Sequence, residues 1–240
     1  MEPTAPVVLA ALDDEVGAAL AFALDEARRH HCPLRVVAYE DDVLQRVLAR
    51  VGEVPAEGRL VSGTPVRAVL DASADARLVV VRRRDLLHLF RALTDPDDVL
   101  PTTWADPPVA CVPPVWSPRP DDDRPITVGV EDAATAGPLL ERALEACGEG
   151  PLRTVHAAHQ RAGVVLLHEA TRSRVLVLGR NPADDRGGTR LGRTARWVLH
   201  EAACPVVVLP PSGTPEPDRS PGRVHLEGCG QRGVPQLGSR

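Results

Sequence analysis

Residues 175–182 read VLVLGRNP, and after nine further residues the chain continues with Gly192-Arg193-Thr194. Four apolar residues that end in glycine are typical of a buried parallel strand whose tip opens into a turn. The residues that follow place apolar side chains at helical spacing, at Ala195, Val198, Leu199 and Ala202. Because the unpaired N–H groups at the start of such a helix would point back toward the strand tip, this spacing predicts an anion site there.

The chain contains an internal repeat. Three pairs of apolar segments match between its halves: 6–13 with 125–131, 76–81 with 173–178, and 108–114 with 205–211. The first pair ends in a carboxylate in both copies, at Asp13 and Glu131, and each copy leads into a helix-like segment. Alternating strands and helices predict an α/β fold with parallel sheets and right-handed crossovers, in which ligands bind at the carboxyl ends of the strands.

The loop after residue 179 resembles the nucleotide loop of the universal stress protein family. That loop follows the pattern Gly, two residues, Gly, nine residues, then Gly-Ser or Gly-Thr. Gly179, Pro182 and Gly192 keep this spacing, but Pro182 replaces the second glycine. Arg193 stands where the hydroxyl residue is expected, and Thr194 comes one place late. The resemblance covers nearly all of residues 5–211 and implies a tandem universal stress protein.

The resemblance and the composition together predict the domain boundaries. We expect two small parallel-sheet domains of the adenine-nucleotide α-hydrolase-like type, a linker, and a disordered tail rich in glycine and proline. Their bounds are 1–113 for the first domain, 114–125 for the linker, 126–211 for the second domain and 212–240 for the tail. In the first half, residues 59–61 are expected as an edge strand. The second half is abbreviated, because one helix and one strand are missing between Val155 and Ala162.

Composition argues against several classes of function. The formal net charge of −5 and the pI near 5.9 give no general attraction to nucleic acid or to an anionic membrane. No apolar run approaches the ~20 residues of a spanning helix and the first residues carry no basic leader, so we expect a cytoplasmic protein. The five scattered cysteines imply no disulfide framework, and the histidines lack the compact spacing of a metal site.

The resemblance places the candidate nucleotide site in the second half only. Gly179 and Gly192 would admit the backbone to the phosphates of ATP, Arg193 or Thr194 would replace the missing hydroxyl contact, and Glu131 matches the family's acidic position near the nucleoside. In the first half the equivalent strand runs into Arg82-Arg-Arg-Asp85, with no glycine from there to the linker. We therefore expect no nucleotide there. The three arginines could still meet an anion, but a solvated cluster at a strand end is the commoner outcome and the interpretation we favour, and we assign them no role.

No Walker lysine motif, Gly-x-Ser-x-Gly or His-Glu-x-x-His occurs in the sequence. We therefore expect a non-catalytic, stress-response binding or signalling protein with an unidentified protein partner. Two alternatives remain open: a nucleotide-hydrolysing or nucleotide-transferring enzyme on the same fold, and a protein-interaction module whose pockets are both vestigial. Family members commonly dimerise along their last strand, so residues 109–112 and 206–209 are predicted to pair as an intrachain pseudo-dimer.

Overall fold

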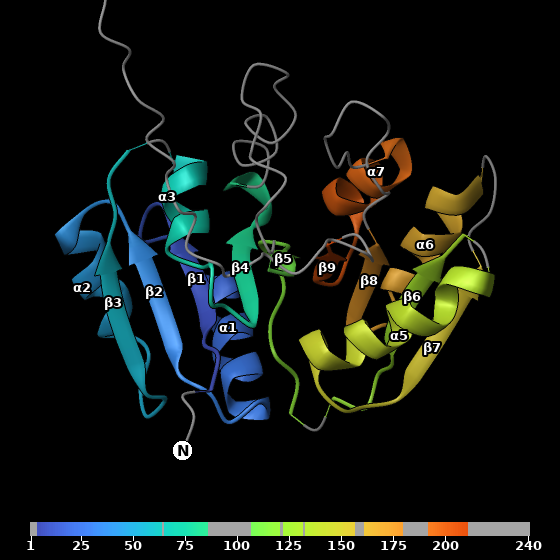
Figure 1. Cartoon of the computed structure of the whole chain (residues 1–240), viewed down its shortest axis with the longest axis horizontal. Coiled ribbons are helices and arrows are strands. Elements are labelled where there is room, and N and C mark those ends of the chain that lie inside the picture. The colour runs from blue at the N-terminus through green and yellow to red at the C-terminus, as the bar shows by residue number, and fades with distance from the viewer. Residues whose placement is uncertain are drawn as a thin grey trace, which may run out of the picture.

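The computed structural model describes residues 4–63, 65–85, 107–120, 122–131, 133–156, 161–179 and 192–210. Within these residues the strands form one nine-stranded sheet in the order β3-β2-β1-β4-β5-β9-β8-β6-β7 (Figure 1). The pairs are parallel except for β5 with β9, which are antiparallel. The sequence therefore folds into the expected α/β class, with both halves sharing one sheet.

The first half supplies five strands and three described helices. The strands are β1 (Val7–Ala11), β2 (Leu34–Ala38), β3 (Ala56–Leu60), β4 (Leu78–Arg82) and β5 (Val109–Val112). The helices are α1 (Gly17–Arg29), α2 (Asp41–Leu48) and α3 (Pro65–Asp71). The apolar strands form because both of their faces are covered, as in other parallel sheets.

The second half supplies four strands and three described helices. The strands are β6 (Ile126–Val130), β7 (Leu152–His156), β8 (Val175–Gly179) and β9 (Val206–Leu209). The helices are α5 (Ala133–Cys147), α6 (Ala162–Ala170) and α7 (Arg193–Glu201). Only residues 157–161 separate β7 from α6. Strand β7 corresponds to β2 of the first half, but β2 pairs with a further strand, β3, whereas β7 is the last strand of the sheet on its side. The expectation that this half lacks one helix and one strand is confirmed.

Two layers of helices cover the sheet, and the strands alternate between them. Val7 and Leu9 of β1 pack in the cluster formed with α1, α2 and α5, whereas Val8 and Ala10 pack in the cluster formed with α3, α6 and α7. This alternation follows from the two-residue period of a strand. Aromatic residues are scarce, so the core is built mainly from valine, leucine and alanine.

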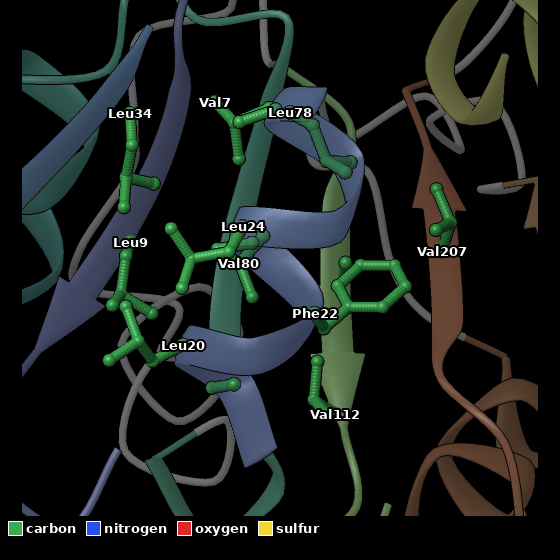
Figure 2. Packing of buried hydrophobic residues seen from close by; sticks show 14 of the residues in the cluster. Val7, Leu9, Leu20, Phe22, Leu24, Leu34, Leu78, Val80, Val112 and Val207 are labelled. Atoms are coloured by element: carbon green, nitrogen blue, oxygen red, sulfur yellow. The ribbon is translucent and has the colours of Figure 1, made fainter. Parts of the chain in front are cut away.

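The two halves meet at β5 and β9. Ala110 lies opposite Val207 in this antiparallel pair, as predicted for the last strands of the two halves. Phe22 of α1 covers the junction in the same buried cluster as Val112 and Val207 (Figure 2). The pairing therefore removes both strands from the edges of the sheet, where unpaired backbone groups would remain.

The segment expected as a linker contains no helix or strand in residues 114–120 and 122–125. Trp116 nevertheless packs edge-on against Phe22, with ring centroids 5.3 Å apart and an interplanar angle of 82°. This contact fixes the start of the segment on the first half. The predicted tail at 212–240 lies outside the described residues.

Candidate functional site

The second half brings its candidate residues to the carboxyl edge of the sheet. Gly129 of β6 pairs with Leu178 of β8, so Glu131 and Gly179 lie just beyond this pair at the same edge. Glu131 is exposed. Residues 180–191, which include Pro182, lie outside the described residues. The edge therefore offers an exposed carboxylate beside a strand that ends in glycine.

Helix α7 begins at the same edge with an uncapped N-terminus. Gly192 is its N-cap, with φ −59° and ψ 160°, and no side chain caps the helix. The first turn contains no acidic residue, Arg193 is exposed and Thr194 is half-buried. Unpaired N–H groups and the positive end of the helix dipole favour an anion at this position. The structure thus places Gly179, Gly192, Arg193, Thr194 and Glu131 on elements that meet this edge.

Gly179 also has a packing role that the sequence did not reveal. A Cβ atom at this position would lie 3.2 Å from Cδ1 of Leu139 on α5. That distance is tighter than ordinary van der Waals contact, so the Leu139 side chain would have to shift to admit a side chain at this position. Gly179 therefore allows Leu139 of α5 to pack closely against the end of β8.

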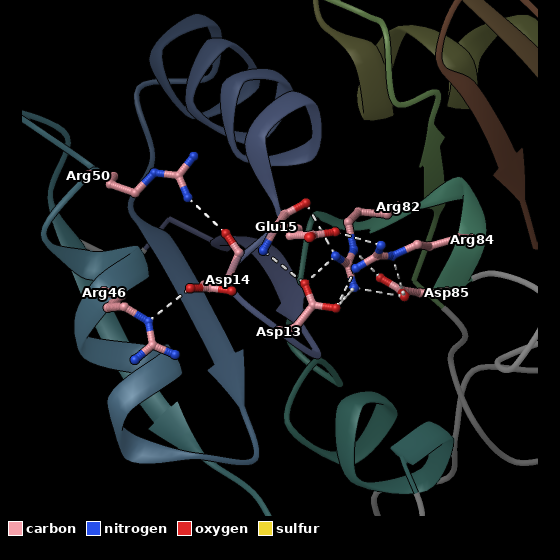
Figure 3. Close-up of polar contacts among 8 residues, drawn as sticks. All are labelled: Asp13, Asp14, Glu15, Arg46, Arg50, Arg82, Arg84 and Asp85. Carbon is pink, nitrogen blue, oxygen red and sulfur yellow. Dashed lines mark hydrogen bonds and ion pairs between the residues drawn. The ribbon is translucent and has the colours of Figure 1, made fainter.

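The first half closes the equivalent edge with an ion-pair network (Figure 3). Arg82 ends β4 as Gly179 ends β8, and its guanidinium group binds the carboxylates of Asp13 and Asp85. Asp85 accepts from Nε and from Nη2, the latter at 2.8 Å. Arg84 adds an ion pair to Glu15 at 2.7 Å. The side chains of Arg82 and Asp85 are only 9% and 7% exposed, so this part of the edge is filled by the chain itself.

The network shifts the pKa values of its members. The hydrogen bond from Arg82 lowers the pKa of Asp13 to about 2, against an opposing effect of burial. Burial alone would lower the pKa of Arg82, but its hydrogen bonds to Asp13 and Asp85 raise the pKa overall. Both groups are therefore held in their charged forms, and each already satisfies the other.

The interpretation of the first-half arginines as a solvated cluster was wrong. Arg82 is buried, and Arg83 is half-buried and donates to the carbonyl oxygen of Ala202 at the end of α7. Only Arg84 of the three is exposed. Sequence reasoning missed this network because its partners, Asp13 and Arg82, are 69 residues apart. One feature of the sequence could have indicated the network: the run Arg82-Arg-Arg-Asp85, which directly follows an apolar segment.

The described residues contain no group of three or more histidine, cysteine, aspartate or glutamate side chains that could hold a metal ion. Four cysteines, Cys32, Cys111, Cys147 and Cys204, are buried free thiols. Burial raises the pKa of Cys111 and of Cys204 to about 12, so neither resembles a reactive nucleophile. None of the described helices is both long and apolar enough to span a bilayer.

Comparison with known proteins identifies the fold through solved structures. No protein-family model and no curated protein matches the sequence. A functionally unknown protein from Pseudomonas aeruginosa is similar with a TM-score of 0.60 and 16% identity, over 87% of this chain and 93% of that one. A universal stress protein from Archaeoglobus fulgidus gives a TM-score of 0.57 at 13% identity, over 85% and 98% of the two chains.

A putative universal stress protein from Pseudomonas aeruginosa is also similar, with a TM-score of 0.53 and 17% identity, over 87% of this chain and 94% of that one. These matches cover 85–87% of the chain and so span both of its halves. The chain therefore has the fold of the universal stress proteins.

Proposed function

We propose that this chain is a non-catalytic, stress-response binding protein that holds one adenine nucleotide, ATP, at the carboxyl edge of its second half. The fold supports a stress-response role, and the preserved spacing of residues 179, 182 and 192 supports the nucleotide. Gly192, Arg193 and Thr194 would contact the phosphates at the start of α7. Glu131 would contact the nucleoside.

One observation carries the proposal: equivalent strand ends differ in the two halves. Arg82 fills the edge of the first half and binds Asp13, whereas Gly179 at the same position has no side chain, and Glu131 is exposed. Because a backbone can approach phosphates closely only where side chains are absent, the second edge suits a nucleotide and the first does not. We therefore expect one equivalent of nucleotide per chain.

Thermal unfolding of the full chain with ATP tests the proposal. A ligand at ~100 times its dissociation constant should stabilise the fold by about 2.7 kcal/mol, which is several degrees of Tm. Gly192→Val should abolish this shift, since a branched side chain would occupy the space that the phosphates need. The apo variant should remain folded, because φ of −59° at Gly192 is open to any residue.

Gly17→Val provides a matched control. Gly17 begins α1 in the first half, and a Cβ atom there would meet only Nη2 of Arg50, at 4.0 Å. This variant should keep the full ATP shift. Arg83→Ala is a poorer control, because Arg83 bonds to Ala202 next to α7. If ATP causes no shift in the unmutated protein, or if the shift survives Gly192→Val, the nucleotide site is wrong.

The proposal that the chain is not an enzyme has its own test. Hydrolysis needs a metal or a base positioned beside the phosphates. The described residues at the second edge supply one exposed carboxylate, Glu131, and cationic or neutral donors. We expect ATP to remain intact during prolonged incubation with the protein. Release of phosphate that Gly192→Val abolishes would instead favour the nucleotide-hydrolysing alternative.

A further inference from the structure

Helix α7 presents an exposed stripe of basic and aromatic residues. Arg193, Arg196, Trp197 and His200 follow the spacing i, i+3, i+4, i+7, and all four are exposed. The opposite side of the helix buries Val198 and Leu199 against the sheet. Trp197 is 45% exposed, although tryptophan in a folded protein is usually highly buried.

Helix α6 presents a matching stripe beside it. Arg161, Val164, Val165 and His168 repeat the same helical spacing, and all are exposed. Val164 is 57% exposed and Val165 is 39% exposed. Figure 1 shows α6 and α7 together in the second half. We call the two exposed stripes together the α6–α7 face; its exposed apolar side chains are Trp197, Val164 and Val165.

Trp197 is held in place by the neighbouring helix. Its ring lies directly on the backbone of α6 at Gly163, where even a methyl group would overlap Cε3 and Cζ3 of the indole. Gly163 is buried. An aromatic side chain fixed in this way loses little conformational freedom on binding, which favours it as an anchor for a partner.

The charged side chains of the α6–α7 face are mostly basic. Arg161, Arg193 and Arg196 form no ion pair with any residue in the described part of the chain. Glu201 is the one acidic side chain that continues the α7 stripe. The whole chain has a formal net charge of −5, so this face departs from the average charge of the molecule. Such a face attracts a negatively charged partner.

We propose that the α6–α7 face binds an acidic, amphipathic helical segment of a partner protein. The partner's apolar side chains would cover Trp197 and Val164, and its carboxylates would pair with the arginines. A second copy of this chain through the same face is disfavoured, since arginines would oppose arginines. A membrane is disfavoured by the overall negative charge and by short valine side chains, which insert little apolar surface into a bilayer.

Fluorescence anisotropy of the full-length protein with a synthetic peptide tests this proposal. The probe is a labelled peptide of about four helical turns, with leucine at i, i+3, i+4 and i+7 positions and glutamate elsewhere. The unmutated protein should bind it, more weakly as salt increases. A peptide of the same pattern with lysine in place of glutamate should not bind.

Two variants locate the binding on this face. Trp197→Ala and Arg196→Glu should each weaken binding about tenfold, the second with a smaller salt dependence. Arg196 is exposed and has no ion pair with a described residue, so Arg196→Glu keeps the test valid if Trp197→Ala unfolds. Arg59→Glu, on the exposed strand β3, changes the net charge equally and should leave binding unchanged.

The outcomes separate this proposal from its competitors. Binding that both variants leave intact, or no binding by the unmutated protein, overturns it. Association with vesicles of phosphatidylserine and phosphatidylcholine that Trp197→Ala abolishes, without peptide binding, overturns it in favour of a membrane surface. The measurement is made without nucleotide, and Gly192→Val should bind the peptide normally. Failure of the ATP proposal therefore leaves this test unaffected.

Discussion

The two halves differ in the residue that ends two equivalent strands, β4 and β8. Arginine at position 82 supplies a guanidinium group that draws Asp13 and Asp85 together, and glycine at position 179 supplies none. Arg82 and Asp85 are buried, so their charges are tolerated only as a satisfied group. The first edge therefore gains a fixed structure, whereas Gly179 adds no side chain to the second.

The lowered pKa of Asp13 allows the contribution of its ion pair with Arg82 to be measured as a change of stability with pH. Its folded value of about 2 lies below the ordinary 3.8, so the contribution to stability is present above about pH 4 and is lost as pH falls toward 2. Its side chain is 42% exposed, so solvent screening limits the contribution to about 1 kcal/mol. Asp13→Asn should lower Tm by about 2–4 °C at neutral pH. The difference from the unmutated protein should shrink as pH falls through that window.

Asp42→Asn is the control for this measurement. Asp42 pairs with Arg46 on the solvent-facing side of α2, and its pKa is also lowered by the hydrogen bond from that arginine. Because the pair is exposed, its loss should change Tm less than the loss of Asp13 does. A Tm difference for Asp13→Asn that stays constant down to pH 2 would contradict the assigned ion pair.

At the scale of elements, apolar strands were predictable from the sequence and polar ones were less so. The runs that became β1, β4, β8 and β9 are apolar because both of their faces are buried. Strand β3 was expected at 59–61 but spans Ala56–Leu60, and all of its residues are exposed. Its position follows from pairing with β2, which a local pattern does not encode.

In the candidate site, too, local features were predictable from the sequence and contacts between distant residues were not. The spacing of Gly179 and Gly192 indicated a strand end followed by a helix start, and the structure places them so. The closure of the first edge and the α6–α7 face depend on residues that are distant in sequence. Gly163 and Trp197, for example, lie on different helices and meet only after folding. Tertiary contacts of this kind have no periodic signal.

Two cysteine thiols at the junction of β5 and β9 should be unreactive in the folded protein. Cys111 lies within β5 and Cys204 precedes β9, and burial raises the pKa of each to about 12. Both should therefore remain unmodified by iodoacetamide at mildly alkaline pH in the native protein, and both should react in urea. Mass spectrometry of the digested protein gives the labelling at each site. Rapid labelling of Cys111 in the native state would show that the junction opens.

At the scale of the whole molecule, polar contacts cross from one half to the other on the α1–α5 side. Nη1 of Arg174, just before β8, lies 2.9 Å from Oε1 of Glu26 on α1. Its Nη2 also donates to the carbonyl oxygen of Cys147 at 2.8 Å, a bond within the second half that holds the guanidinium group in place. In the opposite direction, Arg77 of the first half donates to the carbonyl oxygen of Glu145 at 2.6 Å. These contacts join the halves independently of the β5–β9 pair.

The ion pair between Glu26 and Arg174 is expected to contribute strongly to the stability of the fold. Both side chains are almost fully buried, at 0% and 4% exposed. Arg174→Met leaves the carboxylate of Glu26 buried, with Nε2 of His30, at 3.5 Å, as its remaining ion-pair partner among the described residues. Breaking a buried pair in this way should cost about 3–5 kcal/mol of unfolding free energy, measured by urea denaturation.

The double variant distinguishes charge burial from lost packing. Arg174→Met with Glu26→Leu removes both charges and keeps most of the volume, so it should recover much of the stability that Arg174→Met loses. Arg77→Met should cost only about 1 kcal/mol, because its partner at Glu145 is a neutral carbonyl group. If the double variant is as unstable as Arg174→Met alone, the stability comes from the shape of Arg174 and its bond to Cys147, and the charge of Glu26 does not account for it.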